Sequence, residues 1–151
     1  MKFRTWMDWS GVLAGAIAII AGCSSNSVGQ SEDWGVSSIN DDDTLTVVQG
    51  EQEKTVSLCG VSLKDGAEAK AQLDQWFQES EYRIVIVSAG RDRTNRETVE
   101  VFIELEQGER FVQGDLLIAG LATVDAATVN QCPNGVVMQD AESMAESAES
   151  Q

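Results

Sequence analysis

Alternating apolar and polar positions in the middle of the chain predict a series of short strands. The first two runs are separated by residues 49–51, where Gly50 indicates the turn of a β-hairpin. The third run is rich in β-branched residues, which is typical of strands. The predicted strands cover residues 44–48, 55–59, 82–87, 98–104 and 121–124.

Helical spacing of apolar side chains occurs in two places. The first predicted helix ends near Ser80, and the second is short and ends at Gly120, a residue suited to a left-handed C-cap. Their apolar positions are Ala69, Leu73, Trp76 and Phe77 in the first, and Val112, Leu116 and Ala119 in the second. Short strands, frequent turns and only two helices predict a mainly β, α+β fold around a small, partly closed barrel.

The beginning of the chain has the parts of a secretory signal. Lys2 and Arg4 precede an apolar run over residues 11–20, which is shorter than the roughly 20 residues that span a bilayer. The tetrapeptide Ile20-Ala21-Gly22-Cys23 resembles the bacterial lipobox. This resemblance implies that residues 1–22 are removed as a signal peptide and that acyl chains on Cys23 hold the protein at a membrane. The alternative is an ordinary secreted protein with an unmodified Cys23.

Two polar segments flank the predicted domain. Residues 23–38 are rich in Ser, Asn, Gly and Gln, and they are interpreted as a tether behind the lipid anchor. Residues 136–151 carry three Ala-Glu-Ser repeats without an apolar period, which predicts an acidic, disordered tail or a frayed helix. The folded domain is expected over residues 39–135.

The charge of the chain narrows its possible partners. The 151 residues include 10 Lys and Arg against 25 Asp and Glu, for a net charge of −15. Loss of the predicted leader removes two basic residues and one acidic residue, so 8 − 24 gives −16. Such a surface repels phosphate backbones, so nucleic acid is not expected as a partner. The absence of histidine excludes His-based triads and His-ligated zinc.

Three cysteines in an exported chain leave one without a partner. If Cys23 carries lipid, Cys59 and Cys132 remain, and an oxidising compartment favours a disulfide between them. Two buried thiols are the alternative, because the sequence alone does not show how close the two Cα atoms lie.

Several stretches of the predicted domain resemble those of one family. Residues 41–44, Asp-Asp-Asp-Thr, are similar to its Asp-Gly-Asp-Thr, and residues 56–62, Val-Ser-Leu-Cys-Gly-Val-Ser, to its Val-Arg-Leu-Cys-Gly-Ile-Asp. Residues 92–96, Asp-Arg-Thr-Asn-Arg, are similar to its Asp-Arg-Tyr-Gly-Arg. With these motifs, residues 39–135 resemble the thermonuclease family, whose prototype is the staphylococcal nuclease. The resemblance implies a five-stranded, partly closed barrel of the OB type with two packed helices.

The same resemblance assigns roles to particular residues. In thermonucleases two aspartates bind calcium, a glutamate activates the attacking water, and two arginines bind the phosphate. Asp43 matches the first metal-binding aspartate, Arg96 matches the second arginine, and Asp65 is the candidate for the glutamate. Ser62 stands at the second aspartate and Ser57 at the first arginine, and a hydroxyl supplies neither charge. The implied site is degenerate, because each missing charge stabiliser typically lowers the rate ~10²–10³-fold.

Three functions are compatible with this pattern. The first is a membrane-anchored, thermonuclease-like lipoprotein with negligible nuclease activity and no cofactor, which binds a protein or another component of the bacterial cell envelope. The expected location is a periplasm-facing membrane surface, and Ser24 after the lipidated cysteine is similar to the sorting pattern of the outer membrane, which favours that membrane. The second is a weak calcium-dependent nuclease that uses Asp43, Asp65 and Arg96. The third sets the family aside and makes the small barrel a structural spacer in an envelope complex. For the two residues that match the family, the structural alternatives are that Asp43 only caps the turn before its strand and that Arg96 only pairs with Asp92 or Glu97 on the surface.

Overall fold

The computed structural model describes residues 29–64 and 66–151. The predicted signal peptide, the anchor position Cys23, the first part of the predicted tether and the candidate residue Asp65 lie outside the described residues. The described elements are β1 (Ser31–Ile39), β2 (Thr44–Gln49), β3 (Gln52–Leu58), β4 (Val61–Leu63), α1 (Gly66–Glu79), β5 (Arg83–Arg91), β6 (Glu97–Leu105), β7 (Gly108–Phe111), α2 (Val112–Ile118), β8 (Ala122–Val124), the 3₁₀ helix η1 (Val129–Gln131) and α3 (Gly135–Glu149).

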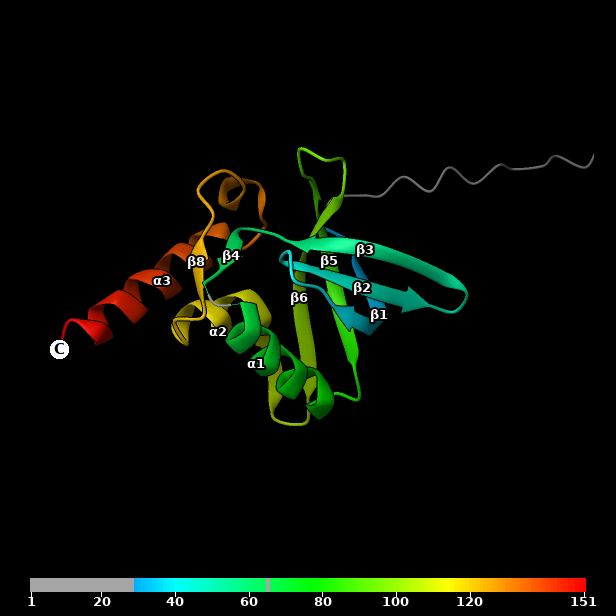
Figure 1. Ribbon diagram of the computed structural model, residues 1–151, viewed down its shortest axis with the longest axis horizontal. Helices are drawn as coiled ribbons and strands as arrows, with labels where there is room; N and C mark the ends of the chain where they lie inside the picture. The colour runs from blue at the N-terminus through cyan, green and yellow to red at the C-terminus, as the bar shows by residue number, and fades with distance from the viewer. Residues whose placement is uncertain (1–28, 65) are drawn as a thin grey trace, which may run out of the picture.

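Five of these strands form a closed barrel (Figure 1). The strand order is β3-β2-β1-β5-β6, and these neighbours are antiparallel. A short parallel pairing closes the barrel, because it places Ser57 and Leu58 of β3 beside Thr98 and Val99 of β6. β7 extends the sheet beyond β6, and β4 pairs with β8 in a separate two-stranded sheet. The structure confirms the predicted mainly β, OB-type barrel.

Alternation along the strands fills the barrel with apolar side chains. The fully buried positions include Leu45 and Val47 of β2 and Val56 of β3. The predicted face of α1, with Ala69, Leu73 and Phe77, is buried in the same core. Trp76 packs partly buried against the core, beneath the guanidinium of Arg110 at 5.0 Å from the ring centroid. In α2, Val112 and Leu116 are buried as predicted, but Ala119 is exposed at the C-cap.

Two predicted turns have the backbone conformation that their sequences require. Gly50 lies in the β2–β3 turn with φ +59°, and Gly120 follows α2 with φ +70°. Glycine adopts this left-handed conformation without the steric penalty of a Cβ atom. The β2–β3 hairpin extends away from the barrel (Figure 1).

The prediction of a tether over residues 31–38 is wrong, because these residues belong to β1. β1 lies between β2 and β5, with Trp34 opposite Ile84 and Val36 opposite Val47. Trp34 is buried in the core. The serines of β1 face outward, so its composition is polar although the strand is central to the sheet.

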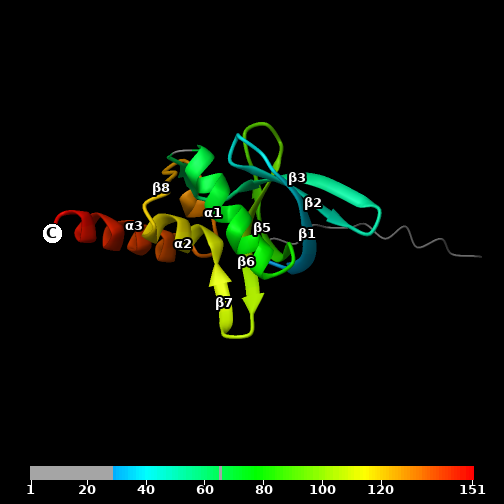
Figure 2. The ribbon, with the colours of Figure 1, turned by 60° about the horizontal axis from the view of Figure 1, so that its bottom comes forward.

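The prediction of a disordered tail is also wrong, because residues 135–149 form α3, a third helix. Gly135, Met138 and Ala141 are buried against the domain, and half-buried Glu142 accepts the backbone N–H of Val124 at 2.7 Å, whereas the other acidic side chains of the helix are exposed. Three buried positions in 15 residues, one of them a glycine, give only a weak apolar period, but Ala, Glu and Met all favour helix. The end of α3 projects away from the barrel (Figures 1 and 2).

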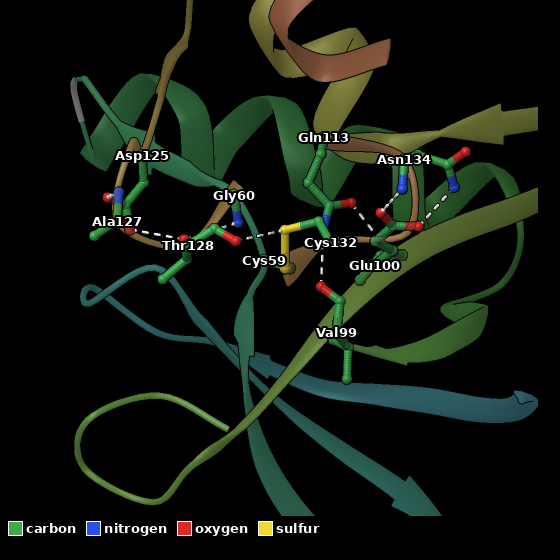
Figure 3. The surroundings of a disulfide bond; sticks show 11 residues. Cys59, Gly60, Val99, Glu100, Gln113, Asp125, Ala127, Thr128, Cys132 and Asn134 are labelled. Atoms are coloured by element: carbon green, nitrogen blue, oxygen red, sulfur yellow. Dashed lines mark hydrogen bonds between the residues drawn. A yellow bond between two sulfur atoms is a disulfide. The ribbon is translucent and has the colours of Figure 1, made fainter. Parts of the chain in front are cut away.

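Covalent and polar contacts attach the C-terminal segment to the barrel (Figure 3). The predicted disulfide between Cys59 and Cys132 is present, with the two Cα atoms 5.9 Å apart. The carboxylate of Glu100, which is fully buried, accepts hydrogen bonds from the backbone N–H of Asn134 at 2.6 Å and from its amide Nδ2 at 2.7 Å. The end of β3 and the outer face of β6 are thereby fixed to the segment that leads into α3.

Candidate functional site

The turn between β1 and β2 contains Asp43, the predicted metal-binding aspartate. Asp43 has a left-handed backbone with φ +58°, and its carbonyl oxygen accepts the N–H of Leu58 at 3.1 Å. Its Oδ1 accepts the N–H of Leu63 at 3.3 Å. The residue therefore connects the start of β2 to the end of β3 and to β4.

The surroundings of Asp43 disfavour its negative charge. Burial raises the pKa of its carboxyl above the ordinary value, and the nearby charges of Asp42 and Asp125 act in the same direction. The hydrogen bond from Leu63 opposes this shift. No cation compensates Asp43 within the described part of the chain, so its carboxylate is destabilised relative to one in water.

Arg96, the predicted phosphate-binding arginine, points to the same turn. Its Nη1 lies 3.3 Å from Oδ2 of Asp42, which forms an ion pair. The hydroxyl of Thr44 also donates to Asp42, and this bond, followed by the charge of Arg96, lowers the pKa of the Asp42 carboxyl. The carboxylate that Arg96 contacts is thus Asp42, and the ion pair occupies one of the five N–H donors of the guanidinium.

The predicted pairing of Arg96 with Asp92 or Glu97 is wrong for its guanidinium. Only the backbone N–H of Arg96 donates to Asp92, at 2.9 Å. Glu97 instead accepts the ammonium of Lys54 at 2.7 Å. Asp92 and Glu97 were expected as partners because they are close to Arg96 in the sequence. In the fold, the partner of the guanidinium is Asp42, which is 54 positions away along the chain.

The two serines lie on the same side of the barrel as this turn. Ser57 of β3 is paired with Thr44 of β2 and with Thr98 of β6, at the point where the barrel closes. Ser62 of β4 is opposite Thr123 of β8, next to Leu63, which contacts Asp43. The structure thus brings Asp43, Ser57, Ser62 and Arg96 to one region, and two of these four positions are uncharged.

The described ranges 29–64 and 66–151 hold no cluster of metal ligands. Within them, no three Asp, Glu or Cys side chains lie close enough together to hold a metal ion. Asp65, the candidate for the water-activating carboxylate, is outside them. The calcium site of the alternative function therefore stays a prediction.

A cavity that the sequence analysis missed adjoins Arg96. It has a volume of about 680 Å³ and lies between the β2–β3 hairpin and the β5–β6 hairpin. Three cations line it: Lys54, Arg91 and Arg96. The sequence does contain one sign of this cavity: Arg91, Arg93 and Arg96 lie close together in a chain with few cations. The presence of Lys54 in the cavity could not be predicted, because it depends on the position of β3 in the fold.

Comparisons with known proteins do not identify the chain. No protein-family model matches it, and no curated protein matches it. The resemblance to thermonucleases therefore stays a prediction that is based on the motifs alone. Among the helices of the described part, none has the length and apolarity to cross a bilayer.

Proposed function

We propose that this protein is a lipid-anchored binding module of the bacterial cell envelope, with a thermonuclease-like barrel and negligible nuclease activity. The observation that carries this proposal is the ion pair between Arg96 and Asp42 at 3.3 Å. A guanidinium that is already paired with a carboxylate has less positive charge to offer a phosphate. In this proposal the barrel acts by binding.

The remaining positions of the site support the same function. Ser57 and Ser62 give neither the second guanidinium nor the second carboxylate that phosphodiester cleavage with calcium needs. The Asp43 carboxylate accepts the backbone N–H of Leu63 and lies near Asp42 and Asp125. A hydrogen bond of this kind can stabilise a turn without any metal ion. Loss of several charge stabilisers together leaves little catalysis, although the individual losses are not additive.

The anchoring half of the proposal rests on the sequence. Cys23 follows a lipobox-like tetrapeptide, and β1 begins at Ser31. Eight residues, 23–30, separate the anchor from the barrel, and such a connection spans at most about 28 Å. The barrel would therefore act close to the membrane surface.

Calorimetric titration of the full-length chain tests the binding-only site. We expect no heat of binding when calcium is added to millimolar concentration in the presence of a nucleotide bisphosphate. Binding that disappears in both Asp43→Asn and Arg96→Ala would contradict the proposal and favour the calcium-dependent phosphodiesterase. Staphylococcal nuclease is the positive control.

Cell fractionation tests the anchor separately. The wild-type chain should sediment with membranes, and Cys23→Ser should move it to the soluble or unprocessed fraction. The matched control is Ser24→Ala, which leaves the cysteine in place. Equal fractionation of wild type and Cys23→Ser would contradict lipid anchoring but leave the barrel's function open to the calorimetric test.

A further inference from the structure

We propose that the cavity between the β2–β3 and β5–β6 hairpins binds a small polar ligand through an oxoanion group, a carboxylate or a phosphate. The inference rests on the proposed function, since it names the ligand class of the binding module. The cavity shares Arg96 with the motif-derived site, but Lys54 and Arg91, which also line it, match none of the catalytic positions of thermonucleases. Its size, about 680 Å³, is within the range of ordinary small-molecule sites.

The floor of the cavity is a fixed network around Trp34. The indole Nε1 donates to Glu32 at 2.9 Å, and the ammonium of Lys54 lies 4.3 Å from the ring centroid. Lys54 also pairs with Glu97 at 2.7 Å and lies 4.0 Å from Glu32. Trp34 is only 6% exposed, so the core fixes the indole ring against which Lys54 and Glu32 lie.

The wall of the cavity offers hydrogen-bond donors that protein groups leave largely unused. Arg91 donates from Nη1 to the carbonyl oxygen of Asn95 at 2.8 Å, and no other side-chain contact of Arg91 is found in the described structure. Arg96 uses Nη1 for Asp42. A guanidinium carries five N–H donors in a planar fork that fits two oxygens of a carboxylate or phosphate. Arg91, whose guanidinium pairs with no carboxylate in the described residues, therefore provides the oxoanion-binding end of the cavity.

The charge of the cavity sets it apart from the rest of this acidic protein. Lys54, Arg91 and Arg96 line it together with the carboxylates of Glu32 and Glu97, and Asp42 pairs with Arg96, so 3 − 3 gives a local charge of 0. The whole chain carries −15. An anionic group therefore meets less repulsion at this cavity than over the rest of the chain, and Arg91 is the cation left to bind it. Neutral side chains of Gln49, Gln52 and Asn95 can hydrogen-bond the ligand's hydroxyl or amide groups.

The experiment uses three probes that share one ring: glucuronate, glucose 6-phosphate and neutral glucose. Each is titrated into the full-length chain by calorimetry, and the indole N–H resonance of Trp34 reports whether it enters the cavity. We expect an acidic sugar, the carboxylate or the phosphate or both, to bind and shift the Trp34 resonance, while glucose does neither. The two acidic probes distinguish the two forms of oxoanion.

Arg91→Gln should weaken the binding of the acidic sugar about 10- to 100-fold, the usual effect of losing a hydrogen bond to a charged group. Arg91→Lys keeps the charge but not the fork, and it should show an intermediate loss. The matched control is Arg83→Gln, at the opposite end of β5, which should bind like the wild type. Circular dichroism checks that each variant is folded, and Arg91→Lys provides the test if Arg91→Gln is not.

Three outcomes would overturn the inference. The first is that neither acidic sugar binds at about 10 mM, since weaker affinity is too low for a specific site. The second is that glucose binds equally well, and the third is that Arg83→Gln weakens binding of the acidic sugar while Arg91→Gln does not. Failure of the proposed function can be distinguished from failure of this inference. Release of inorganic phosphate from glucose 6-phosphate would show that the protein is catalytic, whether or not the cavity binds the sugar. Such release, if Arg91→Gln abolishes it together with binding, would support the cavity as the ligand site and contradict the non-catalytic function.

Discussion

The disulfide between Cys59 and Cys132 allows a quantitative prediction of stability. The two residues are 73 positions apart, so the bond restrains a long segment of the unfolded chain. In the chain-entropy account, closing a loop of this length stabilises the folded state by about 4 kcal/mol. The bond also connects β3 to the segment before α3, so its loss affects the barrel and the C-terminal helix together.

The perturbation is the double variant Cys59→Ala/Cys132→Ala. We expect the free energy of unfolding to fall by about 4 kcal/mol, a large part of the 5–15 kcal/mol typical of a whole domain. Removal of two buried sulfur atoms adds to the loss. Wild-type protein that has been unfolded, reduced and refolded in reductant keeps both side chains, so it isolates the contribution of the covalent bond.

Urea unfolding provides the assay, followed by far-UV circular dichroism for the helices and by tryptophan fluorescence for the barrel. A decrease of less than about 1 kcal/mol in reduced wild type would refute the reasoning, because the unfolded chain would then gain little freedom from reduction. Loss of the dichroism transition alone would also refute it, since it would show that the bond stabilises α3 and not the barrel.

Three further substitutions test individual contacts. Asp43→Asn should stabilise the fold at neutral pH by under about 1 kcal/mol, because the raised pKa of the Asp43 carboxyl means that its ionised form is disfavoured in the folded state. This gain in stability should disappear as the pH falls through the raised pKa toward the ordinary one, where the wild-type carboxyl is protonated. Urea unfolding at a series of pH values measures it, and a gain that does not depend on pH would contradict this reason. Gly60→Ala should destabilise by about 2–4 kcal/mol in thermal unfolding, because Gly60 has φ +78° and a Cβ would lie 2.6 Å from Sδ of Met138; an unchanged Tm would contradict the close approach. Thr98→Val should raise stability by about 1 kcal/mol, because within the described residues the buried Thr98 hydroxyl has no hydrogen-bond partner; destabilisation would indicate one.

The barrel strands could be predicted from the sequence because their alternation reflects burial directly. β2, with Leu45 and Val47 inward, and β6, with Val99 and Val101 inward, show the expected period. β1 escaped prediction because only Trp34 among its first five residues is buried. Its position in the middle of the sheet depends on pairing with β5, which lies about 50 residues further along the chain.

The outer face of β6 shows a second limit of prediction. Glu100 alternates with Val99 and Val101, which is typical of a strand with one face in water. In the structure that face is covered by the segment that carries Asn134, so the carboxylate is fully buried and hydrogen-bonded. A carboxylate's burial depends on which distant segment lies over it, and strand periodicity does not contain that information.

For the candidate site too, some features could be predicted from the sequence and others could not. The motifs could indicate that Asp43 and Arg96 belong to one region, and they lie on neighbouring elements in the structure. They could not indicate that Asp42 would take the guanidinium of Arg96, because this depends on the approach of two loops. The cavity beside them needed β3 to bring Lys54 next to Arg91 and Arg96, which no local pattern shows.

Hydrolysis of nucleic acid is the measurement that tests the central claim most directly. The full-length chain is incubated with single-stranded DNA, double-stranded DNA and RNA in millimolar calcium, with staphylococcal nuclease as the positive control and a chelator as the blank. We predict no cleavage above the blank, because Arg96 is paired with Asp42, and because Ser57 and Ser62 stand where the thermonuclease resemblance would require an arginine and an aspartate. Calcium-dependent cleavage that both the chelator and Arg96→Ala abolish would contradict the account.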